Sequence, residues 1–193
     1  RGECAEGMLD AIASALRGAE RPFLLAGRGA WLAGASAALG GLAAATGALT
    51  ASTALGRGVF PDGRYDLGVT GGFGAEGAME VIREADVAVV FGAGLNQFTM
   101  RFGALFAPGT KVFQIDIAPA ATHPHVGGFV RADARVAAEA LVARLAVSSP
   151  AASASSPAAW RESVDVAAAR AHDHGDDLAP DGRPDPRSTA RRT

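Results

Sequence analysis

The residues best suited to chemistry are glycines that follow apolar runs, because such loops can hold a phosphate group. Gly27 and Gly29 follow the run PFLLA, and Gly92 and Gly94 follow DVAVVF. Glycine lets backbone N–H groups approach a phosphate closely, and the start of a following helix adds a favourable dipole. These loops therefore predict either a nucleotide-phosphate site or tight turns between buried strands and the helices that follow them.

The first loop lacks a complete dinucleotide fingerprint. The pattern G-x-G-x-x-G requires a third glycine, and Leu32 stands at that position. The acid expected at the end of the second strand is replaced by Ser52 and Thr53. These departures exclude the standard NAD-binding half of a Rossmann fold. A tight strand-to-helix turn is then about as well supported as a phosphate-binding loop.

Asp116 is a further candidate, because it ends the run KVFQID and could accept hydrogen bonds from a ribose. A turn or cap acceptor is the equal alternative for this side chain. Gly56 and Gly58 follow the run ALTAS. In a doubly wound sheet ligands bind beyond the carboxyl ends of the strands, where all these residues would gather.

No complete catalytic or metal site is predicted. His123 and His125 are close together, but no Cys or Glu stands near them at metal-ligand spacing. His172 and His174 lie in a polar segment that we interpret as solvated. Cys4 is the single cysteine, which excludes an internal disulfide and favours a reducing, cytoplasmic compartment. Neither a G-x-S-x-G elbow nor a Walker loop occurs.

Predicted strands and helices alternate along most of the chain. Apolar runs predict strands at 22–27, 48–52, 86–92, 111–117 and 129–130. Apolar residues at helical spacing predict helices at 4–16, 32–46, 74–85 and 134–146, and a loop is expected at 53–68. This alternation predicts an α/β fold, a Rossmann-like doubly wound and mostly parallel sheet with helices on both faces.

The helices are expected to bury their larger apolar side chains. These are Leu32, Leu39 and Leu42 in the second helix, and Val136, Leu141, Val142 and Leu145 in the last. The internal Gly40 and Gly41 disfavour the second helix, because glycine is a poor helix former.

The composition changes at Ser148. Residues 148–159 are rich in Ser, Ala and Pro, which is typical of a linker, and 160–172 could form one helix. From Asp173 onward the chain is polar and predicted to be disordered. We therefore expect a domain at 1–147, followed at 148–193 by a linker, a short helix and a disordered tail.

Charge and hydropathy exclude two classes of partner. The chain has 193 residues and a net charge of −2, which gives no electrostatic reason to bind nucleic acid. No apolar run approaches the roughly 20 residues of a membrane span, and no signal-peptide pattern is present. The first residue is Arg1 rather than Met, so we expect a fragment or a processed protein.

Several motifs in order carry a family resemblance. They are AERPFLLAGRGA, TASTALGRGVFPD, LGVTGGFGAEGAMEVIREADVAVVFGAGL, APGTKVFQIDIAPA and FVRADARVAAEAL. Over residues 4–146 this order resembles the central domain of thiamine-diphosphate-dependent enzymes of the acetolactate synthase type. The stretch DGRPDPRSTARR near the end is similar to the lead-in to the next, thiamine-binding domain.

The resemblance implies a role within a larger enzyme. Members of this family are decarboxylases and carboligases that act on 2-oxo acids, and they assemble as dimers or tetramers. Their first and third domains bind thiamine diphosphate and Mg²⁺ and supply the catalytic glutamate and the GDG…N metal motif. The chain contains neither of these, so it is expected to be inactive alone.

The resemblance also implies a DHS-like nucleotide-binding fold, whose strand ends hold FAD or ADP in some members. The matching positions are Gly27, Arg28 and Gly29, Thr53, Ala54 and Leu55, Gly92, Ala93 and Gly94, Asp116 and Ile117, and Asp133.

Other positions depart from the FAD-binding members. Phe73 replaces a histidine, residues 92–98 lack the arginine of G-A-R-F-D-D-R, and Ala118 and Ala121 replace acids. Losing an arginine that can pair with phosphate weakens nucleotide binding. The expected role is therefore a scaffold or nucleotide-binding central domain. The alternatives are a stand-alone ADP- or FAD-binding module and an inactive remnant of such an enzyme.

Overall fold

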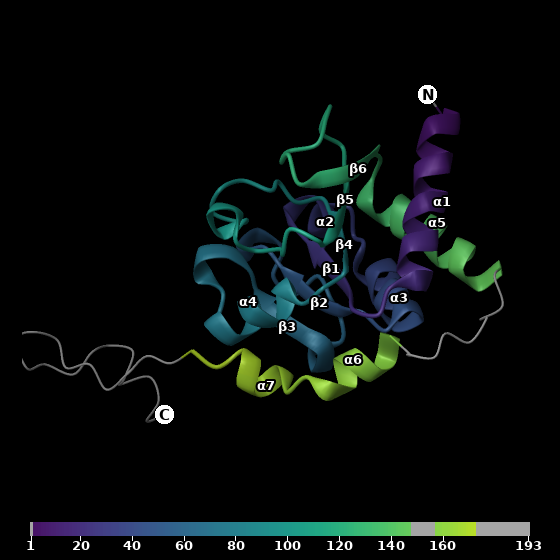
Figure 1. The fold of residues 1–193 in the computed structure, drawn as a ribbon. Coiled ribbons are helices and arrows are strands. Elements are labelled where there is room, and N and C mark those ends of the chain that lie inside the picture. The colour runs from purple at the N-terminus through teal and green to yellow at the C-terminus, as the bar shows by residue number, and fades with distance from the viewer. Residues whose placement is uncertain (1, 148–156, 173–193) are drawn as a thin grey trace, which may run out of the picture.

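The computed structural model describes residues 2–147 and 157–172, which fold around one central sheet (Figure 1). Its strands are β1 (Pro22–Ala26), β2 (Leu49–Ser52), β3 (Asp66–Val69), β4 (Val87–Phe91), β5 (Lys111–Asp116) and β6 (Val126–Arg131). They lie in the order β3-β2-β1-β4-β5-β6, and every neighbouring pair is parallel. The predicted doubly wound α/β fold is confirmed.

The direction of the strand order changes at β1, which pairs with β2 on one side and with β4 on the other. Ligands of doubly wound sheets bind at the carboxyl end of such a switch point. Gly27 directly follows β1, and Gly92 directly follows β4. The topology thus brings together the glycine loop after β1, which we call the first loop, and the glycine loop after β4, which we call the fourth loop.

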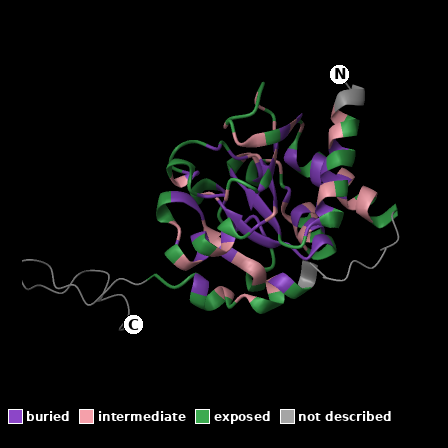
Figure 2. Cartoon of the chain, viewed as in Figure 1, coloured by how far each residue is buried: buried purple, intermediate pink, exposed green. Residues whose placement is uncertain are grey.

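Helices cover both faces of the sheet, as predicted. On one face lie α1 (Gly2–Gly18), α3 (Ser36–Thr46) and α5 (Ala134–Val147), and on the other lies α4 (Glu76–Arg83). Each face of the sheet has its own hydrophobic core, and successive strand residues alternate between them. Leu24 and Val89 belong to the core under α1, α3 and α5, which is the first core, and Leu25 and Val90 belong to the core under α4, which is the second. Figure 2 shows these buried residues concentrated on the strands between the helical layers.

Short 3₁₀ turns occupy several loops, at η1 (Ala54–Gly56), η2 (Gly63–Tyr65), η3 (Gly71–Phe73) and η4 (Arg101–Gly103). Arg101 and Phe102 within η4 both have positive φ, of 47° and 56°. Arg101 is held there by an ion pair with Glu76, with 2.8 Å between Nη2 and Oε2. This pair connects the η4 turn to the start of α4.

The helix predicted at 32–46 is divided into α2 (Arg28–Leu32) and α3. Gly34 lies between them with a φ of +64°, a left-handed conformation that ends the first helix. Leu32 is 64% exposed, so its prediction as a core residue is wrong. Leu39 and Leu42 are fully buried, as predicted.

One predicted core residue of the last helix, α5, is exposed, whereas Leu141 is fully buried as predicted. The buried residues of the helix are Ala134, Ala137, Ala138 and Leu141, whereas Val136 is 55% exposed. α5 packs against α1 and α3, and Val142 and Leu145 lie partly buried against the same core. The prediction of Val136 as a core residue is therefore wrong.

Two strands differ from the expected pattern. β3 overlaps the end of 53–68, which was predicted to be a loop because the strand is short and contains Asp66 and Gly68. It is an edge strand with only Leu67 buried, so it lacks the apolar run that identifies central strands. β6 begins earlier than the predicted 129–130, with two glycines near its start.

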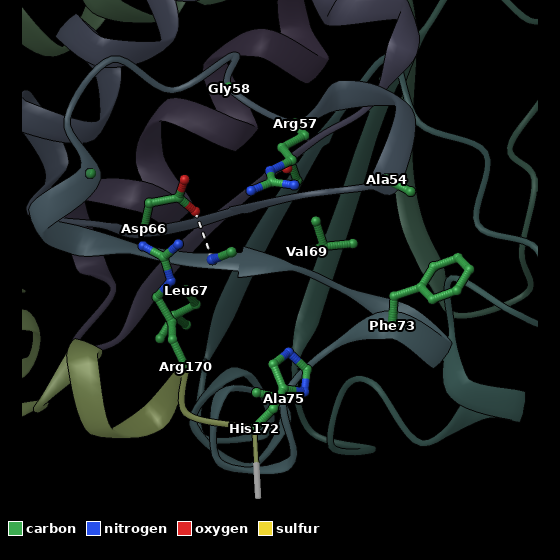
Figure 3. Close-up of a pocket in the computed structure, with 13 residues that line it drawn as sticks. Ala54, Arg57, Gly58, Asp66, Leu67, Val69, Phe73, Ala75, Arg170 and His172 are labelled. Carbon is green, nitrogen blue, oxygen red and sulfur yellow. Dashed lines mark hydrogen bonds between the residues drawn. The ribbon is translucent and has the colours of Figure 1, made fainter. Parts of the chain in front are cut away.

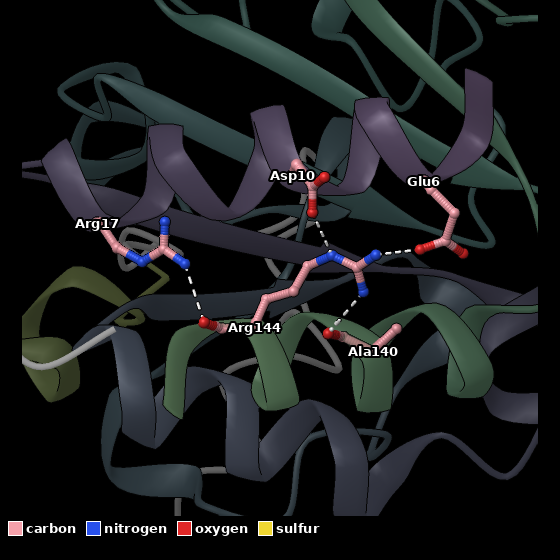
Figure 4. A network of polar contacts seen from close by, with 5 residues as sticks. All are labelled: Glu6, Asp10, Arg17, Ala140 and Arg144. Atoms are coloured by element: carbon pink, nitrogen blue, oxygen red, sulfur yellow. Dashed lines mark hydrogen bonds and ion pairs between the residues drawn. The ribbon is translucent and has the colours of Figure 1, made fainter. Parts of the chain in front are cut away.

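A polar network connects α1 to α5 (Figure 4). The Arg144 guanidinium donates to Asp10 at 2.7 Å and to the Ala140 carbonyl at 3.1 Å, and it also pairs with Glu6. Arg17 donates to the Arg144 carbonyl at 2.9 Å. The hydrogen bond with Asp10 is the main cause that raises the pKa of Arg144, and the pairing fastens the first and last helices of this face.

Residues 157–172 pack against the β3 edge of the sheet. They form α6 (Pro157–Ser163) and α7 (Val166–Ala169), rather than one helix over 160–172. Trp160 and Ala169 are buried in the second core, and the Arg161 guanidinium lies 4.2 Å from the centre of the Tyr65 ring. In Figure 1 this segment runs beneath β3 and α4.

The structure describes only part of residues 148–193, for which further predictions were made. The predicted linker at 148–156 and the tail at 173–193 lie outside the described residues. The division into 1–147 and 148–193 stays a prediction. Within the described ranges, every helix is too short or too polar to cross a bilayer.

Candidate functional site

Five of the twelve predicted site residues line a hollow of about 210 Å³ at the carboxyl edge of the sheet, which we call the edge hollow. It is lined by Gly29, Leu32, Ala33, Gly92, Asp116, Ile117, Ala132, Asp133 and Ala134. The first glycine loop, the fourth loop and both predicted acids therefore contribute to one place. Ala54 lies elsewhere and lines a larger hollow near β2 and β3.

The other predicted positions surround these hollows without lining them. Gly27 and Ala93 are buried beneath the loops, and Thr53 is half-buried. Arg28, Leu55 and Gly94 are exposed.

The glycines of the first and fourth loops are packed directly against each other. A Cβ on Gly27 would lie 2.6 Å from both the Ala93 Cβ and the Gly92 carbonyl oxygen. Gly92 has a φ of +55°, and a Cβ there would lie 2.3 Å from the Ala30 nitrogen. Close backbone packing at the switch point therefore explains why these positions are glycine.

Three backbone donors of these loops are already used. The Gly27 N–H donates to the Phe91 carbonyl at 2.9 Å, and the Gly29 N–H donates to the Gly92 carbonyl at 2.8 Å. The Gly92 N–H donates to the Ile115 carbonyl at 2.8 Å. These three N–H groups fasten strand ends together, which favours the tight-turn interpretation of the loops. Nucleotide binding at the edge hollow stays a prediction.

Both predicted acids act in local turns. The Asp116 carboxylate accepts from the Ala118 N–H at 2.9 Å, which is the turn-acceptor alternative. Asp133 accepts from the N–H groups of Arg135 and Val136, at 2.9 and 3.2 Å, and so caps the start of α5. Each side chain lines the edge hollow, while one of its carboxylate oxygens accepts a hydrogen bond from the local backbone.

Sequence reasoning missed a buried amide that organises this edge. Gln114 is fully buried, and its Nε2 donates to the Ala93 carbonyl at 3.0 Å and to the Thr122 hydroxyl at 2.7 Å. Its Oε1 accepts from the Thr122 N–H at 2.9 Å, and the Thr122 hydroxyl also accepts from the Leu95 N–H. The signal for this role in the sequence was a single amide within a largely apolar strand. A buried polar group needs hydrogen-bond partners, so such an amide indicates a local network.

The histidines form local contacts. The His125 N–H donates to Nδ1 of His123 at 3.1 Å, and the His125 Nε2 lies 3.1 Å from the Thr110 carbonyl oxygen. Among the described residues, His, Cys, Asp and Glu side chains never gather in threes around a point that could hold a metal. The described residues thus do not fit a Mg²⁺ site or a thiamine diphosphate site that depends on it.

A second hollow of about 650 Å³ lies between the loop after β2, the edge strand β3 and the end of α7 (Figure 3). We call it the β2–β3 hollow. Its charged and aromatic lining is Arg57, Asp66, Phe73, Arg170 and His172. Arg170 and His172 come from the segment that was predicted to follow the domain, so the sequence did not indicate this hollow.

The fold and its carboxyl edge define a Rossmann-like α/β domain. A family model described as "Thiamine pyrophosphate enzyme, central domain" matches residues 9–146. The chain therefore belongs to this family, as the order of its motifs predicted.

Individual relatives agree with this assignment. An acetolactate synthase large subunit, as named in Methanocaldococcus jannaschii, is 31% identical over 123 residues, which are 63% of this chain and 20% of that protein. A solved structure described as a thiamin diphosphate-dependent enzyme from Mycobacterium smegmatis matches with a TM-score of 0.58 and 25% identity. That match covers 72% of this chain and 27% of the other. The chain thus spans about a fifth to a quarter of these relatives.

Proposed function

We propose that the chain serves as the non-catalytic central domain of a larger thiamine-diphosphate-dependent enzyme that acts on 2-oxo acids. The reaction class would be decarboxylation or carboligation, as a lyase or transferase of the acetolactate synthase type. Family membership and the acetolactate synthase relative support this role. The chain corresponds to only 20% of that relative, which leaves room for the catalytic parts elsewhere.

Thiamine diphosphate and Mg²⁺ would be bound by other domains of that enzyme. The described residues offer no acidic or histidine cluster for the metal. The GDG motif is also absent from the sequence. This chain's own contribution is therefore to hold and orient neighbouring domains.

Within the central domain we favour a scaffold role over nucleotide binding. The observation that carries this preference is that the N–H groups of Gly27, Gly29 and Gly92 all donate to strand-end carbonyls. A phosphate would have to compete with bonds that hold the sheet edge together. Large apolar side chains are also exposed around that edge, with Trp31 at 57%, Leu55 at 70% and Ile117 at 70%.

Exposed apolar side chains in one region are typical of a surface that another protein part covers. We propose that the edge residues are buried in an assembled cytoplasmic homo-oligomer, a dimer or a tetramer. FAD or ADP in the edge hollow is the competing role, because Gly29, Asp116 and Asp133 do line that hollow together.

The test is to denature the purified chain and to analyse the released small molecules by absorbance and mass. A scaffold domain releases no nucleotide and ignores added ADP and FAD. A stoichiometric flavin or adenine nucleotide would contradict the scaffold role and would place the nucleotide in the edge hollow if Asp116→Ala abolished its retention.

A further inference from the structure

The β2–β3 hollow has the size and shape of a small-molecule site. Its volume of about 650 Å³ is within the range of ligand pockets in proteins. Its walls come from the loop after β2, from β3, from the turn after β3 and from the end of α7. It lies at the β3 side of the sheet and shares no lining residue with the edge hollow.

Its electrostatic character is opposite to that of the whole chain. The chain has a net charge of −2, whereas Arg57 and Arg170 line the hollow together with a single carboxylate, Asp66. Within the described residues, neither guanidinium has a hydrogen bond or an ion pair at contact distance. Figure 3 shows both guanidinium groups turned toward the interior, with the Asp66 carboxylate between them in this view.

The fold holds the backbone at Arg170 in place from several sides. Asp165 caps α7 by accepting from the Ala168 N–H at 2.9 Å, and Arg170 directly follows that helix. Ala169 is buried against α4, where a Cβ on Gly77 would lie 3.1 Å from the Ala169 carbonyl oxygen. A Cβ on Gly68 would lie 3.4 Å from the Arg170 Nε, so the glycine leaves room for the guanidinium beside β3.

The remaining lining suits the non-ionic part of a ligand. One Asp66 oxygen accepts from the Gly68 N–H at 2.9 Å, and its other oxygen can accept from a ligand hydroxyl. The Phe73 ring is 65% exposed and is supported by Phe98, with 5.0 Å between the ring centres. The hollow thus combines two anion-binding groups, one hydroxyl acceptor and one apolar wall.

We propose that the β2–β3 hollow binds a small organic phosphate, with the phosphate on the guanidinium groups of Arg57 and Arg170 and a ligand hydroxyl on Asp66. Guanidinium groups bind phosphate through paired, charge-assisted hydrogen bonds, which makes arginine the preferred side chain for this task. The binding site depends on residues of the α6–α7 segment, so it is complete only when that segment is docked on the domain. The proposal is independent of the scaffold role and of the edge hollow.

The test is calorimetric titration of the full chain at low ionic strength with ribose 5-phosphate, ADP and inorganic phosphate, and with ribose as the uncharged control. We expect saturable binding of ribose 5-phosphate, weaker binding of inorganic phosphate and none of ribose. Arg57→Gln and Arg170→Gln should each weaken binding roughly tenfold or more, because each removes a charge-assisted hydrogen bond. Circular dichroism checks that each variant remains folded.

Two matched variants make the result specific. Arg135→Gln removes an equal charge from the exposed start of α5 and should leave the affinity unchanged. Arg28→Gln removes the exposed arginine of the first glycine loop and should also have no effect. The proposal is overturned if none of the phosphates binds, if ribose binds as well as its phosphate, or if binding depends on Arg28 and not on Arg57 and Arg170.

Discussion

At the scale of single residues, the carboxyl edge is organised by backbone contacts that leave no space for side chains. Gly27, Gly29 and Gly92 bring two strand ends together, and their N–H groups bond to strand carbonyls. Gly94 lies only two residues after Gly92, yet a Cβ there would meet no atom within 4 Å. Glycines in the same loop thus have different physical reasons for being glycine.

This difference gives a prediction. Gly27→Ala should lower the free energy of unfolding by about 1–3 kcal/mol, because the new methyl group overpacks the contact with Ala93. Gly94→Ala should change it by less than about 0.5 kcal/mol, as for an ordinary surface position. Urea unfolding of both variants measures the difference, and equal losses would mean that the loops are not packed as described.

The Asp66 carboxyl gives a pH-dependent prediction. Burial raises its pKa above the ordinary value of 3.8, and the Gly68 N–H and the Arg170 charge partly oppose the rise. A raised folded-state pKa means that protonation stabilises the fold. That contribution is complete below the unfolded pKa and is lost as the pH rises through the folded pKa.

Asp66→Asn keeps an oxygen for the Gly68 N–H and never ionises. The variant should therefore gain stability relative to the unmodified chain as the pH rises from about 3 to about 7. Chemical unfolding at several pH values measures this difference. A difference that stayed constant, or that changed in the opposite direction with pH, would show that burial does not control this carboxyl.

The sequence predicted which residues gather at the carboxyl edge of the sheet better than it predicted the contacts that they make there. Gly29, Gly92, Asp116 and Asp133 do gather at one hollow, because parallel strands end at the same edge. The role of Gln114 could not be predicted, since its partners at Ala93 and Thr122 depend on loop conformation. Contacts between loops are set by tertiary packing, which spacing along a single chain does not encode.

At the scale of elements, α6 and α7 cover the edge strand of the sheet. An uncovered edge strand exposes backbone groups that can pair with other chains, and proteins commonly protect such edges with a helix or loop. Trp160 anchors the cover, since only 9% of it is exposed, and Tyr65 near β3 contacts Arg161 and Glu162. Residues of this segment thus form part of the second core.

The two tryptophans test this role of α6. Trp160→Ala should lower the free energy of unfolding by about 3 kcal/mol, because it removes a buried ring whose Nε1 has no hydrogen-bond partner among the described residues. Trp31→Ala is the matched control and should cost less than about 0.5 kcal/mol, since Trp31 is 57% exposed. Comparable losses in urea unfolding would contradict docking of α6 on the domain.

The elements that the sequence predicted best are the central ones. Strands β1 and β4 are buried along their whole length and appear as continuous apolar runs, and β5 keeps a partly apolar run with Val112 and Ile115 buried. β3 was missed because an edge strand with Asp66 and Gly68 resembles a loop in composition. The exposure of Val136 was missed because most of the buried residues of α5 are alanines, which carry little signal.

At the scale of the whole molecule, the chain is one domain type out of a larger family architecture. It belongs to the thiamine pyrophosphate enzyme central domains, and it spans 20% of its acetolactate synthase relative. The described residues contain an edge of packed glycine loops and no cluster that could hold a metal. Our account is therefore that this chain supports chemistry performed by other domains.

The most direct test of this account measures whether the purified chain consumes pyruvate, a simple 2-oxo acid, in the presence of thiamine diphosphate and Mg²⁺. We predict a rate equal to that of the protein-free mixture at every chain concentration. Consumption that rises in proportion to the chain concentration and disappears when thiamine diphosphate is omitted would contradict the account, because it would place a catalytic centre within these 193 residues.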